Sequence, residues 1–167
     1  MEKVEKKKNS NRRGSFFGRP KPEFDQKILN IRRVTRVVAG GRRFSFSIAL
    51  VVGDKKGKVG VALGKASDVA SAIRKGMKRA RKNMITVAMK GLTIPHVVQI
   101  KKGAALVLLK PAPDGTGVRA GGAVRAVVEA AGIQNIVSKI LGTRNKISNA
   151  TAVIEGLKKL KQNKAHV

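Results

Sequence analysis

The chain contains no cysteine, no tryptophan and no tyrosine, and phenylalanine occurs only five times. Without cysteine it can form no disulfide, and the two histidines, His96 and His166, are too few nitrogen ligands for a structural zinc site. Many modules that read single-stranded bases need aromatic side chains on which the bases stack. These absences argue against a zinc-stabilised domain and against recognition that depends mainly on base stacking.

Acidic residues are also scarce, at nine among 167 residues. Most are scattered along the chain near glycine or lysine, at Asp54, Asp68, Asp114, Glu129 and Glu155. No spacing among them suggests a general acid/base pair or a magnesium cage. The sequence therefore predicts no enzyme activity, no metal and no other cofactor.

Long hydrophobic segments are missing as well. No apolar run approaches the roughly 20 residues that a membrane-spanning helix requires. The N-terminal residues lack the apolar stretch of a secretory signal peptide. We therefore expect a soluble protein that works inside the cell.

Positive charge is what the chain has in excess. Lysine and arginine number 37, which gives a formal net charge of +28. Self-repulsion of that size weakens a compact state unless a polyanion shares the space. Because 42% of the residues are hydrophobic, the chain can still form a core. The composition predicts a folded protein of one medium or two small domains whose partner is structured nucleic acid.

Residues 1–24 are predicted to form a flexible basic arm. Their cations greatly outnumber their acids, and Pro20 and Pro22 stand near the end of the segment. Arms of this kind often become ordered only on nucleic acid. A solvated tail without a binding role is the alternative.

Residues 25–91 are predicted to form the first domain. Strand-like runs at 27–38, 44–52 and 59–63 are separated by glycine-containing turns at 39–43 and 53–57. Ser67 is the predicted N-cap of a helix that extends to about Asn83, and a short strand is expected at 85–89. The pattern predicts a three-stranded meander followed by a helix.

The predicted helix has two very different faces. Val69, Ile73, Met77 and Ala80 form a narrow apolar stripe, with Met84 in line. Six cations fill the opposite arc with no acidic residue among them: Arg74, Lys75, Lys78, Arg79, Arg81 and Lys82. Basic helix faces are often only solvated, but this uninterrupted arc favours contact with nucleic acid.

Residues 92–103 are predicted to be a linker and the first strand of a second domain, which occupies residues 104–167 and ends in a short basic tail. A hairpin is expected around 101–103, followed by a glycine-rich loop. A helix is then expected over 123–131, with Gly132 at its end. A strand within 133–141 and a final helix over about 148–160 complete the domain. The overall prediction is an α+β protein of two small domains.

Several glycine loops resemble phosphate-binding motifs without matching one. The segments that begin at Gly53, Gly60 and Gly115 have the wrong spacing for a P-loop or a dinucleotide fingerprint. Glycine still allows a backbone to approach a phosphate closely, although these glycines could simply permit sharp turns. The predicted RNA-binding residues of these loops and their surroundings are Lys55, Lys56, Lys58, Lys65, Arg119, Gly121 and Gly122, the last two at a helix start that could bind an anion.

The turn between the first two strands carries a second charged feature, formed by Gly40, Gly41, Arg42 and Arg43. Two arginines at the end of a two-stranded arm can project well beyond the domain body. A merely solubilising tip is the alternative, but together with the basic helix the pattern favours insertion into or against RNA.

Taken together, these motifs resemble a known family. The runs 38–46 (VAGGRRFSF), 51–54 (VVGD), 57–60 (GKVG) and 64–66 (GKA) are similar to the N-terminal domain of the fifth small-subunit ribosomal protein. The runs 115–117 (GTG), 120–127 (AGGAVRAV) and 129–132 (EAAG) are similar to its C-terminal domain. The resemblance covers about 26–160 and fits the bacterial form. Arg43 departs from it, because a hydrophobic residue is common there, and the arm matches nothing.

The resemblance implies a double-stranded-RNA-binding-like β-β-β-α first domain and a second α+β domain, in the cytoplasm and in the ribosome. It implies contact with ribosomal RNA at the neck and central pseudoknot, with the fourth and eighth small-subunit proteins, and with messenger RNA near its entry path. Gly117 and Arg125 would lie at the contact with the fourth protein, where decoding accuracy is affected. The alternatives are a free RNA-binding regulator or chaperone, and a ribonuclease P protein-like subunit.

Overall fold

Two long antiparallel strands dominate the first half of the molecule. The computed structural model describes residues 24–161, and within them β1 (Asp25–Val38) pairs with β2 (Gly41–Gly53) along its whole length. Gly41 has a φ of +140°, which only glycine adopts readily, and it follows the tight turn from Val38. Of the predicted arm, all but Phe24 lies outside the described residues.

The remaining strands complete a four-stranded sheet with the order β1-β2-β3-β4. β3 (Lys58–Ala66) runs antiparallel to β2, and the two-residue β4 (Ile85–Thr86) pairs with the start of β3. The predicted meander is confirmed, although the expected strand at 85–89 is shorter than predicted. A register shift between Ile28 and Asn30 interrupts β1.

β2 is buried on both sides from Ile48 to Gly53, which explains its continuous apolar run. Ile48, Leu50 and Val52 contact the side covered by α1 (Val69–Lys82), whereas Ala49 and Val51 belong to a cluster on the opposite side. Successive strand residues point to opposite faces, so one strand serves two cores.

The start of α1 differs from the prediction. Its N-cap is Asp68 rather than Ser67, and the Asp68 carboxylate accepts hydrogen bonds from the backbone N–H groups of Ala70 and Ser71. A carboxylate here satisfies two unpaired donors and lies at the positive end of the helix dipole.

The most buried residues of α1 also differ from the predicted apolar stripe. Its fully buried residues are Ala72, Gly76 and Ala80, whereas the predicted Val69, Ile73 and Met77 are only partly buried. Small residues lie at the centre because the helix approaches the sheet very closely.

The second half contains another four-stranded sheet, of order β5-β6-β8-β7, and two helices. The elements are β5 (Val98–Lys102), β6 (Ala105–Pro111), β7 (Val118–Arg119), α2 (Gly122–Ala131), β8 (Ile136–Ile140) and α3 (Lys146–Lys159). The predicted hairpin, both helices and the role of Gly132 are confirmed, with Gly132 in the left-handed region at the end of α2. The prediction missed β7, and it began the last strand three residues early.

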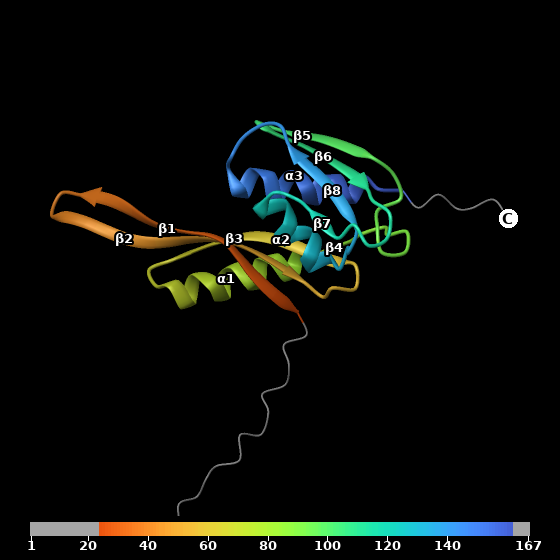
Figure 1. Ribbon diagram of the computed structural model, residues 1–167. Coiled ribbons are helices and arrows are strands. Elements are labelled where there is room, and N and C mark those ends of the chain that lie inside the picture. Colours follow the sequence, from red (N-terminus) through yellow and green to blue (C-terminus); the bar gives the residue numbers. More distant parts are fainter. Residues whose placement is uncertain (1–23, 162–167) are drawn as a thin grey trace, which may run out of the picture.

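The elements form four layers (Figure 1). α1 covers one face of the first sheet, α2 and α3 lie against the other face, and the second sheet covers these two helices. One hydrophobic cluster therefore includes residues of both halves, among them Val51 and Val59 from the first sheet and Val127 and Leu157 from the helices. The predicted domain boundaries remain a prediction, but contacts across them are extensive.

The predicted linker is held firmly within the fold. Ile94 is buried, and the Leu92 carbonyl oxygen accepts hydrogen bonds from the backbone N–H groups of Gln134 and Asn135. Thr93 Oγ1 donates to the Asn135 carbonyl oxygen at 2.6 Å. This segment is fixed to the turn between α2 and β8.

Candidate nucleic-acid interface

The solvent face of α1 carries all six cations that the sequence predicted there. Arg74, Lys75, Lys78, Arg79, Arg81 and Lys82 are all exposed. A shallow groove along this face is lined by Arg74, Met77, Lys78, Arg81 and Lys82. Within residues 24–161, the side chains of Lys75, Lys78 and Lys82 make no hydrogen bond or ion pair. These ammonium groups can therefore neutralise phosphate without breaking an existing contact.

Two arginines of this helix are oriented by the fold. Arg79 donates through Nη1 to the Leu63 carbonyl oxygen at 3.2 Å, and the Arg81 guanidinium lies 5.3 Å from the centre of the Phe24 ring. Such contacts restrict long side chains before binding and so reduce the entropy lost on binding. The helix is a pre-arranged row of cations.

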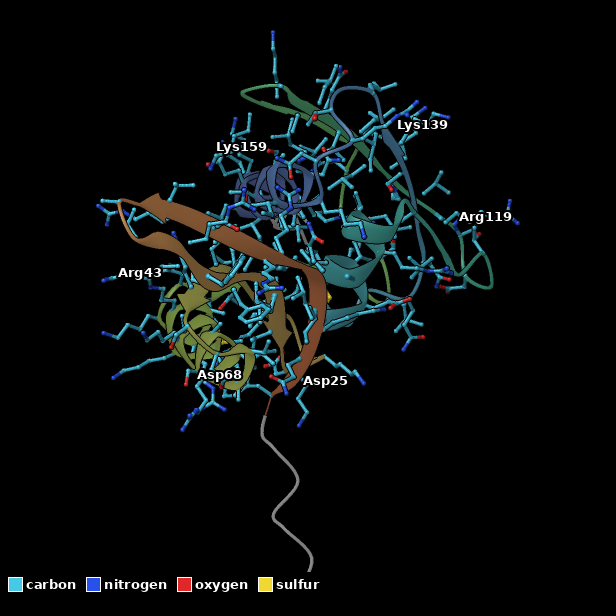
Figure 2. The ribbon with its side chains drawn as sticks, turned by 90° about the vertical axis from the view of Figure 1, so that its left-hand side faces the viewer. Asp25, Arg43, Asp68, Arg119, Lys139 and Lys159 are labelled. Carbon is cyan, nitrogen blue, oxygen red and sulfur yellow. The ribbon has the colours of Figure 1, made fainter. Side chains whose placement is uncertain are left out.

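The β1–β2 hairpin extends beyond the rest of the first sheet (Figure 1). The last pair between β2 and β3 is Phe46 with Ala66, so residues 41–45 of β2 pair with β1 alone. At about 3.3 Å per residue, this part projects by about 15–20 Å. Arg42 and Arg43 are exposed near its end, as predicted, and Figure 2 shows Arg43 on the outer part of the hairpin.

β1 carries three further exposed arginines that were not among the predicted site residues, namely Arg32, Arg33 and Arg36. Arg36 lies directly opposite Arg43 across the strand pair. The signal was present in the sequence as arginines within a strand that is too polar to be buried on both faces. The prediction overlooked these arginines because it used only the β-branched residues of this segment.

The loop 53–58 lies at the other end of β2 from the hairpin tip. Lys55, Lys56 and Lys58 are exposed, but the loop itself is held against α2. The backbone N–H groups of Lys55 and Gly57 donate to the carbonyl oxygens of Ala130 and Ala131 at 3.0 and 2.9 Å. Since β2 spans about 40 Å, the structure does not bring these lysines to the same place as Arg42 and Arg43. Exposed Lys65, opposite Ser47 on β2, lies nearer the hairpin.

Lys55 also makes an ion pair with Asp25, with 2.9 Å between Nζ and Oδ2. The hydrogen bond from Lys55, together with its positive charge, lowers the pKa of the Asp25 carboxyl below its ordinary value. This pair fastens the start of β1 to the loop 53–58.

A second group of predicted residues gathers at the start of α2: Gly117, Arg119, Gly121, Gly122 and Arg125. Gly121 is the N-cap and supplies no side-chain hydrogen bond, so the first N–H groups of the helix lack a side-chain cap. Arg119 is exposed and points away from the body in Figure 2. This group lies in the second half and is separate from α1.

Arg125 and Gly117 are each fixed by a neighbour. Arg125 donates through Nη2 to the Val118 carbonyl oxygen at 3.1 Å, and its Nε lies 3.2 Å from Glu129 Oε1. The Gly117 N–H donates to Oδ1 of buried Asn135 at 3.0 Å, and the Asn135 amide donates to Asp114. The loop and the helix start therefore form one firm surface.

Each of the six acidic residues between positions 24 and 161 has a structural contact. Asp54 and Asp68 accept backbone N–H groups, Asp114 holds Asn135, and Asp25, Glu129 and Glu155 pair with lysine. None lies on α1 or between Gln26 and Gly53 of the hairpin. In this described part no group of three or more metal-binding side chains occurs, and no helix is long and apolar enough to span a membrane.

These features define the class of the molecule: a basic α+β protein of two halves, with a helix face and a hairpin suited to RNA. Residues 24–88 match the family model described as Ribosomal protein S5, N-terminal domain, and residues 100–166 match that of its C-terminal domain. The chain is also 56% identical, over 135 residues that make up 81% of each sequence, to the small ribosomal subunit protein uS5 of Syntrophobacter fumaroxidans.

The chain belongs to the ribosomal protein S5 family. This confirms the predicted resemblance and the predicted α+β fold of two domains. It makes the chain an RNA-binding structural constituent of the small ribosomal subunit, which acts in translation in the cytoplasm. The family is one of ribosomal structural proteins rather than of enzymes.

Proposed function

We propose that the α1 face and the β1–β2 hairpin form one continuous surface that binds ribosomal RNA near the neck and the central pseudoknot of the small subunit. The observation that carries this proposal is the row of six exposed cations on α1, with no acidic residue on that helix or between Gln26 and Gly53 of the hairpin. Each phosphate that is neutralised releases condensed counterions, which is the main source of affinity for a polyanion.

The hairpin extends this surface in one direction. Its projecting arginines can reach RNA about 15–20 Å beyond the sheet, whereas α1 remains against the domain body. Two rigid elements at a fixed relation hold the shape of folded RNA better than a flexible basic tail can. This supports a role in bracing the neck during subunit assembly.

The start of α2 is the proposed contact with the fourth small-subunit protein, through Gly117 and Arg125. The anchoring of Gly117 by Asn135 and of Arg125 by Glu129 gives a pre-formed surface, as a protein interface requires. Changes at this contact would alter decoding accuracy. Contacts with the eighth small-subunit protein and with messenger RNA at its entry path complete the proposal.

Two alternatives lose support from the comparisons. A ribonuclease P protein-like subunit is disfavoured because both halves of the chain match the two domains of the ribosomal S5 family. A free regulator or chaperone is disfavoured because the matched relative is named as a small-subunit protein.

Charge reversal on the helix tests the RNA-binding proposal. In Arg74→Glu, Lys78→Glu and Arg81→Glu combined, we expect at least a tenfold loss of incorporation into reconstituted small subunits, because three phosphate contacts become repulsive. Salt-washed gradients measure incorporation. Stability should change little, since exposed substitutions each cost within about 0.5 kcal/mol.

A matched control reverses the same charge elsewhere, at Lys101, Lys110 and Lys139 of the second sheet. These lysines are exposed, and Figure 2 shows Lys139 far from Asp68, the N-cap of α1. The control should incorporate much better than the α1 variant. Equal incorporation of the two variants would mean that the α1 face is only solvated.

A further inference from the structure

Phe44 is an exposed aromatic residue on the projecting hairpin. Its side chain is 46% exposed, whereas Phe24 and Phe46 are partly buried. Phe46 and Ile48 follow on the same face of β2, and Ile48 is fully buried beneath α1. The apolar stripe of this face thus continues past the end of the helix, and Phe44 is where it becomes uncovered.

Arg33 lies over the Phe44 ring, with 3.8 Å between its guanidinium carbon and the ring centre. Arg33 stands opposite Phe46 on the neighbouring strand, so it reaches Phe44 diagonally. A planar cation and an aromatic ring are therefore stacked in advance on a surface that other chain segments leave open.

The surroundings indicate what covers this surface. Val37, 74% exposed, and Ile31, 49% exposed, lie on the same face, and Arg42 stands directly opposite Val37. The sequence from Gln26 to Gly53 contains no acidic residue. A protein partner could cover the apolar side chains, but a surface whose charges are all positive favours a polyanion that also has flat apolar rings. An unpaired nucleotide has both properties.

We propose that the Arg33–Phe44 pair is a stacking site for an unpaired nucleobase of the small-subunit RNA, with Arg42 beside it to contact phosphate. The inference rests on the proposed function, because it takes the hairpin to be bound to RNA. Aromatic residues are scarce in this chain, so most of the proposed interface would recognise the RNA by its backbone and shape. At this position the interface would hold a base.

Small subunits reconstituted with Phe44→Leu test the site. Leucine keeps apolar bulk but has no ring to stack on, so an unpaired nucleotide that the wild-type protein immobilises should become mobile. Acylation of RNA 2′-hydroxyl groups measures this, and we expect loss of protection at one or a few unpaired nucleotides. Phe44→Trp should restore the protection. Val97→Ala, which removes exposed apolar surface from the second half of the chain and not from the hairpin, should leave it unchanged.

An identical acylation pattern for the wild-type protein and Phe44→Leu would overturn the stacking site. A photoreactive phenylalanine analogue at position 44 gives a second measurement, in which cross-linking to a nucleotide supports the site and cross-linking to a protein overturns it. Failure of the wild-type protein to enter the subunit would instead contradict the proposed function, so the two failures are distinguishable.

Discussion

Single glycines determine how closely α1 lies on the first sheet. A Cβ on Gly64 would overlap the Ala72 carbonyl oxygen, and one on Gly60 would overlap the Ala80 carbonyl oxygen. Neither glycine has a positive φ, so the requirement is for space and not for an unusual backbone conformation. The position of the α1 cations relative to the hairpin thus depends on the absence of a side chain at Gly60 and Gly64.

Replacing Gly64 with alanine should destabilise the fold by about 1–3 kcal/mol, because backbone atoms of a helix cannot move aside cheaply. Urea unfolding measures the change. Gly122→Ala is the matched control, since a Cβ there would meet no described heavy atom within 4 Å. Its expected effect is within about 0.5 kcal/mol. Equal effects of the two substitutions would show that the close approach of α1 is unimportant for stability.

At the scale of elements, ion pairs join segments that are distant in sequence. Asp25 and Lys55 connect the start of β1 to the loop 53–58, and Glu129 of α2 pairs with Lys27 of β1. Glu129 also pairs with Arg125, one turn earlier in α2. All these groups are substantially exposed, so each pair contributes about 0–1 kcal/mol. These pairs therefore contribute more to the relative position of β1, the loop 53–58 and α2 than to stability.

The Asp25–Lys55 pair predicts a small acid dependence of stability. The pKa of Asp25 is lower in the folded state, so between the folded and unfolded pKa values the unfolded chain binds more protons. The stabilisation is therefore present above about pH 4 and is lost as the pH falls through the folded value. Urea unfolding of wild type and Asp25→Asn should differ by up to about 1 kcal/mol at pH 6 and converge in stronger acid. A constant difference would contradict this assignment.

The sequence predicted most elements because their patterns are local. The apolar run at 48–52, the glycine turns and the six cations of α1 each require only neighbouring residues to be recognised. β7 was missed because its two residues, Val118 and Arg119, are ordered only by pairing with distant β8.

Similar reasons explain what was missed in the candidate site. Arg32, Arg33 and Arg36 gain significance only once the hairpin is known to extend beyond the body. The anchoring of Gly117 by Asn135 joins residues that are 18 positions apart, and no local pattern indicates such a contact.

At the scale of the whole molecule, the two halves share a core. The cluster that includes Val51, Val127 and Leu157 passes between both sheets, and backbone hydrogen bonds join the loop 53–58 to the end of α2. Neither half can lose its structure without exposing apolar surface of the other. The family models divide the chain into two domains, but we expect the contacts between the halves to make them unfold as a single cooperative unit.

Calorimetry should therefore show one unfolding transition for the full chain, with a van't Hoff enthalpy equal to the calorimetric enthalpy. The transition temperature should rise with moderate salt, because salt screens the self-repulsion of a chain with a net charge of +28. Two separated transitions would show that the halves unfold independently.

The central claim is that many phosphate contacts, several of them from α1, bind this protein to ribosomal RNA. The most direct test is the salt dependence of binding to a fragment of small-subunit RNA. With about ten phosphates contacted, the slope of log affinity against log salt should lie between about −7 and −9. Neutralising Arg74, Lys78 and Arg81 with glutamine should make the slope shallower by about 2 to 3. A wild-type slope near about −2, or no change in the glutamine variant, would contradict the account.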